Sequence, residues 1–73
     1  MENITMERFA SRLKELRLEN ELSQAELATE TGLTQVAITY WETEKRTPNA
    51  RAIIILARYF NVTTDYLLGE KDY

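Results

Sequence analysis

The sequence predicts an all-α fold of five short helices, and three observations lead to this prediction. Apolar residues recur at the spacing of about 3.6 residues that marks one face of a helix. Residues that favour helix N-caps stand directly before the segments with this spacing. No window reads convincingly as a strand, since "AIIILA" lies between a helix cap and a helix end. With 73 residues, the chain is long enough for one small domain.

The first predicted helix begins near Thr5, which we expect to be its N-cap, and ends at Glu19. Phe9, Leu13 and Leu16 recur on one face of this helix. That spacing predicts that the three side chains lie in the core.

The second predicted helix begins at Ser23. Ser23 and Glu26 form an S-x-x-E capping box, in which each side chain bonds a free amide at the helix start. Leu27 and Ala28 supply its buried side. Gly32 ends the helix, because glycine readily adopts the left-handed conformation found at helix C-termini.

The third predicted helix is capped by Thr34 and runs to about Thr43. One side is bulky and apolar and carries Ala37, Ile38 and Trp41. The other side carries an amide, a β-branched apolar residue, two hydroxyl groups and a phenol. These belong to Gln35, Val36, Thr39, Thr43 and Tyr40. Solvated helix faces usually carry Lys and Glu, so this side is either a solvated face or a contact surface for a partner.

The fourth predicted helix covers residues 50–60, with Asn49 as its N-cap. Asn61 can adopt the left-handed conformation that ends a helix. Ile55 and Tyr59 lie on a second apolar stripe, beside the core face of this helix. The stripe is either a broader core contact or an exposed surface for a dimer or another partner.

The fifth predicted helix covers residues 64–68. Thr63 caps its start and Gly69 closes its end. The domain is therefore expected to span residues 1–69, and the tail at 70–73 is expected to fray.

The composition excludes several classes of site. The chain has no cysteine and no histidine, which removes disulfides, thiolate metal sites and the commonest general base. We therefore expect no enzyme activity, no metal and no cofactor. The chain has no run of about 18 apolar residues, and its start, "MENITMERFASR", lacks the apolar centre of a secretion signal. We expect a cytoplasmic protein without membrane contact.

The charge is unevenly distributed. A net charge of -3 argues mildly against nucleic-acid binding. Residues 23–44 hold four acidic residues and no basic one, whereas residues 45–58 hold four basic residues and no acidic one. A local basic patch therefore directly follows the third predicted helix.

Two short helices joined at "TGLT" (31–34) form a helix-turn-helix arrangement. In this arrangement the second helix is the one that enters the major groove of DNA. The motif therefore favours a contact surface over a solvated face on the third predicted helix.

Six segments in this order carry a strong resemblance to the phage-repressor and Cro-like helix-turn-helix family, also called the xenobiotic-response-element family. They are "RLKELR" (12–17), "LSQAELA" (22–28), "TGLTQVAITYWE" (31–42), "KRTPN" (45–49), "LARYFNV" (56–62) and "DYLLG" (65–69). The resemblance covers residues 8–69. It implies a compact five-helix, lambda-repressor-like DNA-binding domain, with the helix-turn-helix at helices 2 and 3, and a sequence-specific regulator that binds double-stranded operator DNA as a repressor.

The resemblance implies base contacts from the third helix. Gln35 matches a base-reading position, and glutamine suits the N6 and N7 edge of adenine. Val36 matches a position that packs against thymine methyl groups. Thr39 and Tyr40 match further positions that face the groove, although Tyr40 is bulkier than the usual residue and can instead reach a phosphate.

The resemblance also implies a set of phosphate contacts, which comprises Gln24, Thr34, Lys45, Arg46, Asn49 and Arg51. The free amides at the start of the fourth helix favour a phosphate there as well. Arg17 and Glu42 match a partly buried ion pair between the first and third helices, and we expect a structural role for them.

Two residues depart from the family in its turns. Glu21 and Glu44 stand where the family usually has glycine. A left-handed glutamate costs roughly 1 kcal/mol, so we expect these two turns to be built differently. Glu44 also places an acidic group beside the expected phosphate path, which weakens non-specific binding.

The sequence offers two candidate surfaces for a partner. Tyr66 and Leu67 match the fifth helix, which helps form the dimer in many relatives, and Ile55 and Tyr59 form the apolar stripe described above. We expect a two-fold homodimer that reads two half-sites about one DNA turn apart. The alternative is an antitoxin or antirepressor-like module that binds a protein partner through this stripe, with DNA binding secondary.

Overall fold

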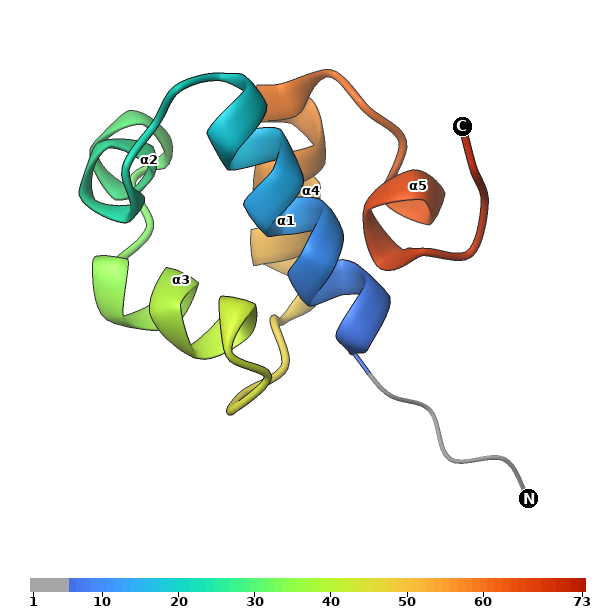
Figure 1. Cartoon of the computed structure of the whole chain (residues 1–73), viewed down its shortest axis with the longest axis horizontal. Helices are drawn as coiled ribbons and strands as arrows, with labels where there is room; N and C mark the ends of the chain where they lie inside the picture. Colours follow the sequence, from blue (N-terminus) through green and yellow to red (C-terminus); the bar gives the residue numbers. More distant parts are fainter. Residues whose placement is uncertain (1–5) are drawn as a thin grey trace.

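The computed structural model describes residues 6–73, and these form five α-helices (Figure 1). The helices are α1 (Glu7–Glu19), α2 (Gln24–Thr31), α3 (Gln35–Glu42), α4 (Ala50–Phe60) and α5 (Thr64–Leu68). Residues 6–73 contain no strand, so the predicted all-α class is confirmed. None of the helices in this part of the chain is long and apolar enough to cross a membrane.

Side chains cap the start of four of these helices. Each cap oxygen accepts a hydrogen bond from the backbone N–H three residues later, at 2.8 to 3.1 Å. The caps are Ser23, Thr34, Asn49 and Thr63, as predicted. Helix α1 differs, because its N-cap is Met6 and makes no side-chain cap bond. The predicted cap Thr5 lies outside the described residues.

The turns after α1 and α3 have the left-handed conformation that usually requires glycine. The expectation that Glu21 and Glu44 avoid this conformation is therefore wrong. Glu21 and Glu44 adopt left-handed backbone conformations, with φ of 56° and 62°. After α1, the N–H of Leu22 bonds the carbonyl of Arg17 at 3.0 Å, and the N–H of Glu21 bonds that of Leu18 at 3.0 Å. This is the Schellman pattern, whose two backbone bonds hold the left-handed residue in place. The end of α3 repeats it.

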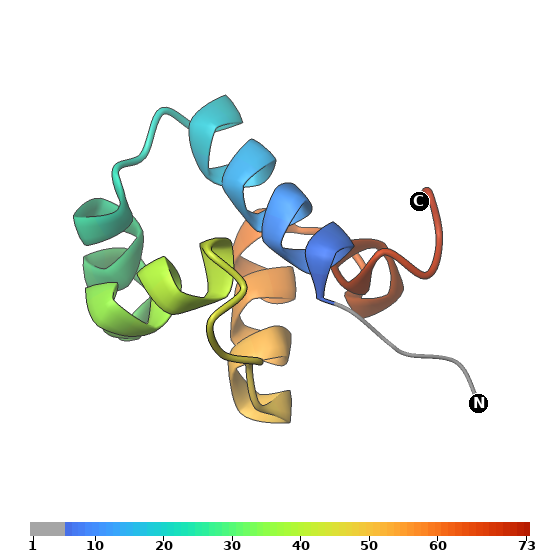
Figure 2. The ribbon, with the colours of Figure 1, turned by 60° about the horizontal axis from the view of Figure 1, so that its bottom comes forward.

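Helix α1 lies at the centre of the molecule, with α2 and α3 on one side and α5 on the other (Figures 1 and 2). It packs against both α3 and α5. The buried core takes side chains from every helix: Phe9, Ala10, Leu13, Leu16, Leu27, Ala28, Ile38, Trp41, Ala52, Leu56, Ala57 and Leu67. The apolar faces predicted for the first two helices are thus confirmed. This packing fixes how α3 presents its outer side.

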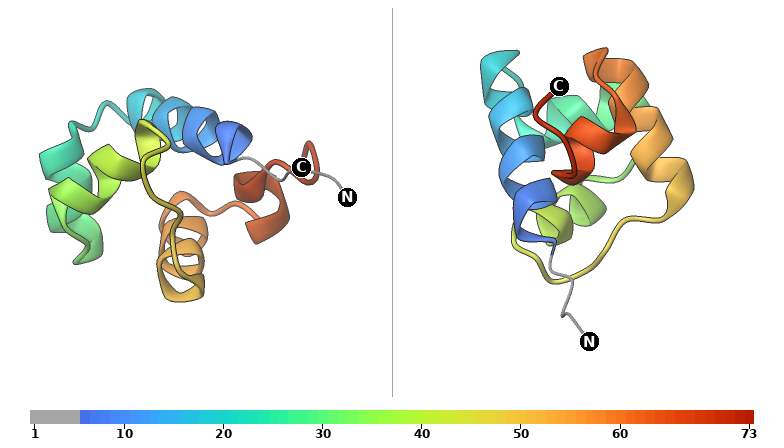
Figure 3. Two further views of the ribbon diagram at one scale, coloured as in Figure 1. Left: turned by 90° about the horizontal axis from the view of Figure 1, so that it is seen from below. Right: turned by 90° about the vertical axis from the view of Figure 1, so that its right-hand side faces the viewer.

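The end of α5 and the segment that follows it lie beside α1 (Figure 3), and two arginines of α1 bind them. Arg8 donates to the carbonyl of Gly69 at 2.7 Å. Arg12 donates to the carbonyls of Tyr66 and Lys71 at 2.5 and 2.6 Å, and its guanidinium lies 4.1 Å from the centre of the Tyr66 ring. The Tyr66 carbonyl also accepts from the backbone N–H of Gly69 at 3.0 Å, so the arginines add to the backbone cap and hold the end of α5 against α1. The predicted fraying of residues 70–73 stays a prediction.

Candidate nucleic-acid interface

The inner side of α3 is fixed by its two buried side chains. Ile38 has no exposed surface and Trp41 is 7% exposed. The Trp41 ring meets Phe9 of α1 edge to face, with 6.5 Å between the ring centres. Since these anchors occupy one side of a regular helix, the residues of the opposite side face outward.

The outer side of α3 forms a shallow depression of about 270 Å³, lined by Gln35, Val36, Thr39 and Tyr40. These are the four predicted base-contact residues, so the structure brings them together on one surface. Val36 is 62% exposed, which is unusual for a β-branched apolar side chain. The contact of these residues with bases stays a prediction.

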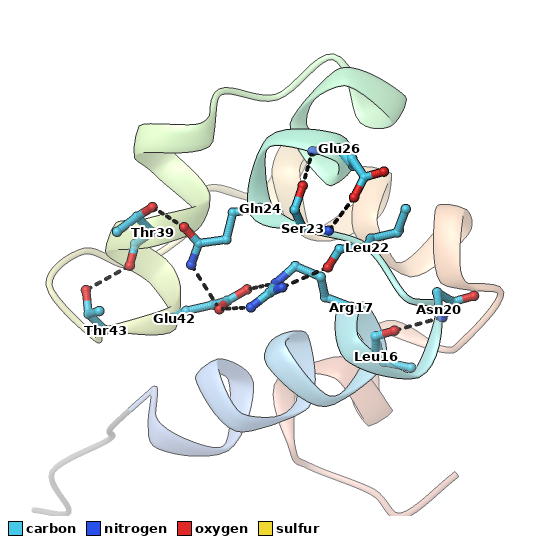
Figure 4. Close-up of polar contacts among 10 residues, drawn as sticks. All are labelled: Leu16, Arg17, Asn20, Leu22, Ser23, Gln24, Glu26, Thr39, Glu42 and Thr43. Atoms are coloured by element: carbon cyan, nitrogen blue, oxygen red, sulfur yellow. Dashed lines mark hydrogen bonds and ion pairs between the residues drawn. The ribbon is translucent and has the colours of Figure 1, made fainter.

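A chain of hydrogen bonds runs from α1 through α3 to α2 and back to α3 (Figure 4). Both carboxylate oxygens of Glu42 accept from Arg17, at 2.7 and 2.9 Å. The amide nitrogen of Gln24 donates to Glu42 Oε1 at 3.1 Å. The hydroxyl of Thr39 donates to Gln24 Oε1 at 2.5 Å. We call these four residues the polar relay.

The ion pair at the start of the polar relay is nearly excluded from solvent, as expected for a structural pair. The Arg17 side chain is 10% exposed and that of Glu42 is 4% exposed. The hydrogen bonds with Glu42 raise the pKa of Arg17 above its ordinary value. A further nitrogen of Arg17 donates to the carbonyl of Leu22 at 2.8 Å. The pair therefore ties α1, the following turn and α3 together.

Three of the residues predicted to contact phosphates keep hydrogen-bond donors that the fold does not use. The amide nitrogen of Gln24 carries two N–H groups, of which one donates to Glu42. Asn49 caps α4 through its oxygen, and Thr34 caps α3 as an acceptor. The remaining N–H of Gln24, the side-chain N–H groups of Asn49 and the hydroxyl proton of Thr34 can still donate to an anion.

Basic residues follow the outer side of α3 along the chain. Lys45, Arg46 and Arg51 are all exposed, in the loop after α3 and the first turn of α4. The Arg46 guanidinium lies 5.6 Å from the centre of the Tyr40 ring, within reach of a cation–π contact. The aromatic ring therefore links the depression to the basic loop. Glu44 is exposed in the same loop.

A family model described as helix-turn-helix matches residues 13–67, which run from within α1 to within α5. The chain belongs to the helix-turn-helix family. Its described part holds α2, the turn at Gly32 and α3 in the order that this family requires.

Two solved structures share this architecture. The P22 c2 repressor, solved in complex with a synthetic operator, has a TM-score of 0.79 and 28% identity, over 86% of this chain and 96% of that one. The restriction-modification controller protein C.AhdI from Aeromonas hydrophila has a TM-score of 0.77 and 31% identity, over 85% and 94% of the two chains.

A curated relative is longer than this helix-turn-helix chain. The HTH-type transcriptional regulator YobD of Bacillus subtilis is 33% identical over 64 residues. The match covers 88% of this chain and 57% of YobD. The chain thus spans little more than half the length of that relative.

The partner surface predicted for the helix-turn-helix domain needs one correction. Leu67 has no exposed surface, because its side chain is part of the core. Tyr66 is half-buried beneath Arg12. On α4, Ile55 is half-buried and Tyr59 is 37% exposed. Ile54 is more exposed, at 44%, and sequence reasoning missed it because it lies outside both apolar stripes of that helix.

The polar relay is the second feature that sequence reasoning missed. The sequence predicts a phosphate contact for Gln24 and a base contact for Thr39, but no bond between the two. Their separation of 15 residues gives no local signal. The spacing from Gln24 to Glu42, which is 18 residues, gives none either.

Proposed function

We propose that this chain is a sequence-specific regulator of transcription that binds double-stranded DNA and acts as a repressor by occupying its operator. The observation that carries the proposal is the depression on α3, where the four predicted base-contact residues share one outward surface. An α-helix fits the major groove, in which each base pair presents a distinct set of donors and acceptors. The operator-bound P22 c2 repressor, with the same fold, supports the assignment.

In this proposal, phosphate contacts position the domain on DNA and base contacts select the sequence. Lys45 and Arg46 attract the DNA backbone and set the position of the domain, without carrying sequence information. The side chains of the depression select the sequence. Gln35 pairs with adenine, and Val36 packs against a thymine methyl group.

Fluorescence anisotropy tests this division. The full chain is titrated with a labelled duplex from the upstream region of its own gene and with a scrambled duplex, at two salt concentrations. We expect preferential binding to the upstream duplex that weakens as salt rises. Gln35→Ala should reduce the preference between the two duplexes, whereas Arg46→Ala should weaken binding to both duplexes equally.

Arg58→Ala is the matched control for Arg46→Ala, because it removes an equal charge from the last turn of α4. It should leave both affinities close to those of the wild type. Equal binding of the wild type to both duplexes argues against a base-reading role for α3. The same conclusion follows if Gln35→Ala lowers affinity equally on both.

A second candidate function rests on the exposed apolar side chains of α4. Ile54 and Tyr59 are 44% and 37% exposed. Apolar surface of this kind suits a second copy of the chain, in a two-fold dimer that reads two half-sites. It also suits a protein partner, as in an antitoxin or antirepressor. Light scattering of wild type and Ile54→Lys distinguishes them: a dimer in the wild type alone supports self-association, and a monomer in both favours a protein partner.

A further inference from the structure

We propose that Glu42 fixes the direction of the hydrogen bond made by Thr39, and so determines which bases α3 prefers at one position of its operator. The inference rests on the proposed function. It concerns a specificity determinant that does not itself face the DNA, since the Glu42 side chain is 4% exposed.

The direction of the hydrogen bonds in the polar relay follows from the ion pair at its start. Arg17 donates to both carboxylate oxygens of Glu42, and a carboxylate has no proton to donate in return. Gln24 must therefore turn its amide nitrogen, and not its oxygen, toward Glu42. The amide oxygen then points away from Glu42, toward Thr39 (Figure 4).

Thr39 completes the polar relay with a fixed role. Because Gln24 presents an oxygen to it, the Thr39 hydroxyl must donate its only proton there. Its oxygen keeps acceptor capacity, and its methyl group remains free. Thr39 lines the outer depression, so it presents an acceptor and a methyl group on the reading side of α3, but no donor.

This arrangement predicts a base preference. In the major groove, adenine and cytosine offer amino donors, and thymine offers a methyl group. Guanine offers acceptors at N7 and O6. A threonine without a free donor can accept from adenine or cytosine and contact thymine, but it cannot donate to guanine. We expect guanine to be disfavoured on the strand edge that Thr39 faces.

Selection from a random duplex pool tests the preference with the full chain. Thr39→Val keeps the shape of the side chain but loses its oxygen. The base pair whose preference changes in this variant is the operator position that residue 39 faces. Gln24→Met removes the acceptor and frees the Thr39 proton. At the identified position, it should reduce the preference for adenine or cytosine over guanine about fivefold, as expected for one net hydrogen bond.

Thr29→Val is the matched control, because the Thr29 hydroxyl bonds a carbonyl within α2. It should leave the selected sequence unchanged. If Thr39→Val alters a position and Gln24→Met leaves the guanine discrimination there intact, the inference is wrong and the proposed function stands. If the wild type enriches no sequence, the proposed function fails, and the base preference fails with it.

Nuclear magnetic resonance of the free protein tests the bond direction without DNA. The two side-chain amide protons of Gln24 should shift in Glu42→Gln, because one of them faces Glu42. They should keep their positions in Thr39→Val, because the oxygen faces Thr39. The opposite result, a shift in Thr39→Val alone, means that the amide is reversed and overturns the inference.

Discussion

Arg17 binds both carboxylate oxygens of Glu42, at 2.7 and 2.9 Å, and so joins the last turn of α1 to the last residue of α3. Since both side chains are at most 10% exposed, the removal of one leaves a buried charge without its partner. We expect Glu42→Ala to lower the free energy of unfolding by about 3 kcal/mol, measured by urea denaturation.

The matched control for this prediction removes both charges. Arg17→Met combined with Glu42→Leu replaces the pair by apolar side chains of similar size, and it should recover much of the loss. If the double variant is as unstable as the sum of the two single changes, the pair does not act as a unit.

Replacing the two left-handed glutamates by glycine should stabilise the fold. Glu21 and Glu44 have positive φ angles that glycine adopts without the steric cost of a Cβ atom. Glu21→Gly and Glu44→Gly should each raise the free energy of unfolding by about 1 kcal/mol, and thermal unfolding measures the change. Glu15→Gly, at an exposed position within α1, should lower stability. A loss in all three variants contradicts the prediction.

Substitution by alanine should lower the free energy of unfolding more at Gly69 than at Gly32. Both glycines have positive φ angles, of 82° and 76°. A Cβ at Gly69 would collide with the side chain of Arg8, whereas nothing lies within 4 Å of one at Gly32. Gly32→Ala should cost about 1 kcal/mol from backbone strain alone. Gly69→Ala should cost about 2 kcal/mol or more, because strain and overpacking add. Equal costs in calorimetry argue against the close approach of Arg8.

The capping box of α2 should contribute to the stability of the fold in a pH-dependent way. Hydrogen bonds from the backbone and side chain of Ser23 lower the pKa of Glu26 below its ordinary value of 4.5. A lowered folded-state pKa stabilises the fold above pH 4.5, and this contribution is lost as pH falls through the folded value. Glu26→Gln removes the charge that these hydrogen bonds favour, so it should cost stability at neutral pH, and the difference from wild type should shrink in acid.

Thr34→Ala is the control for this pH dependence. Thr34 also caps its helix, but α3 has no acidic residue in its first turn. Its cost, determined by urea denaturation over the same pH range, should not shrink in acid in the same way. If the losses of stability in Glu26→Gln and Thr34→Ala vary with pH in parallel, the Glu26 carboxylate is not the cause.

The features that the sequence predicts well are local ones. The bounds of α4 and α5 follow from Asn49, Asn61, Thr63 and Gly69, because caps act through bonds within a few residues. The outer side of α3 follows from helical periodicity once Ile38 and Trp41 are placed in the core.

The features that the sequence does not predict depend on packing between helices. The bond from Thr39 to Gln24 exists only because α2 and α3 meet at one angle. The burial of Leu67 requires α5 to lie against α1 and α4. Glu21 shows a different limit: its side chain disfavours a left-handed conformation that the two backbone bonds of the turn nevertheless hold.

The polar relay divides the outer side of α3 into positions that differ in their freedom to mutate. Val36 is 62% exposed, and surface positions of this kind usually accept substitution with changes within about 0.5 kcal/mol. Thr39 is bonded to Gln24, which is bonded in turn to the buried pair. A substitution at Val36 therefore breaks no hydrogen bond, whereas one that removes the Thr39 hydroxyl leaves the Gln24 oxygen without its donor.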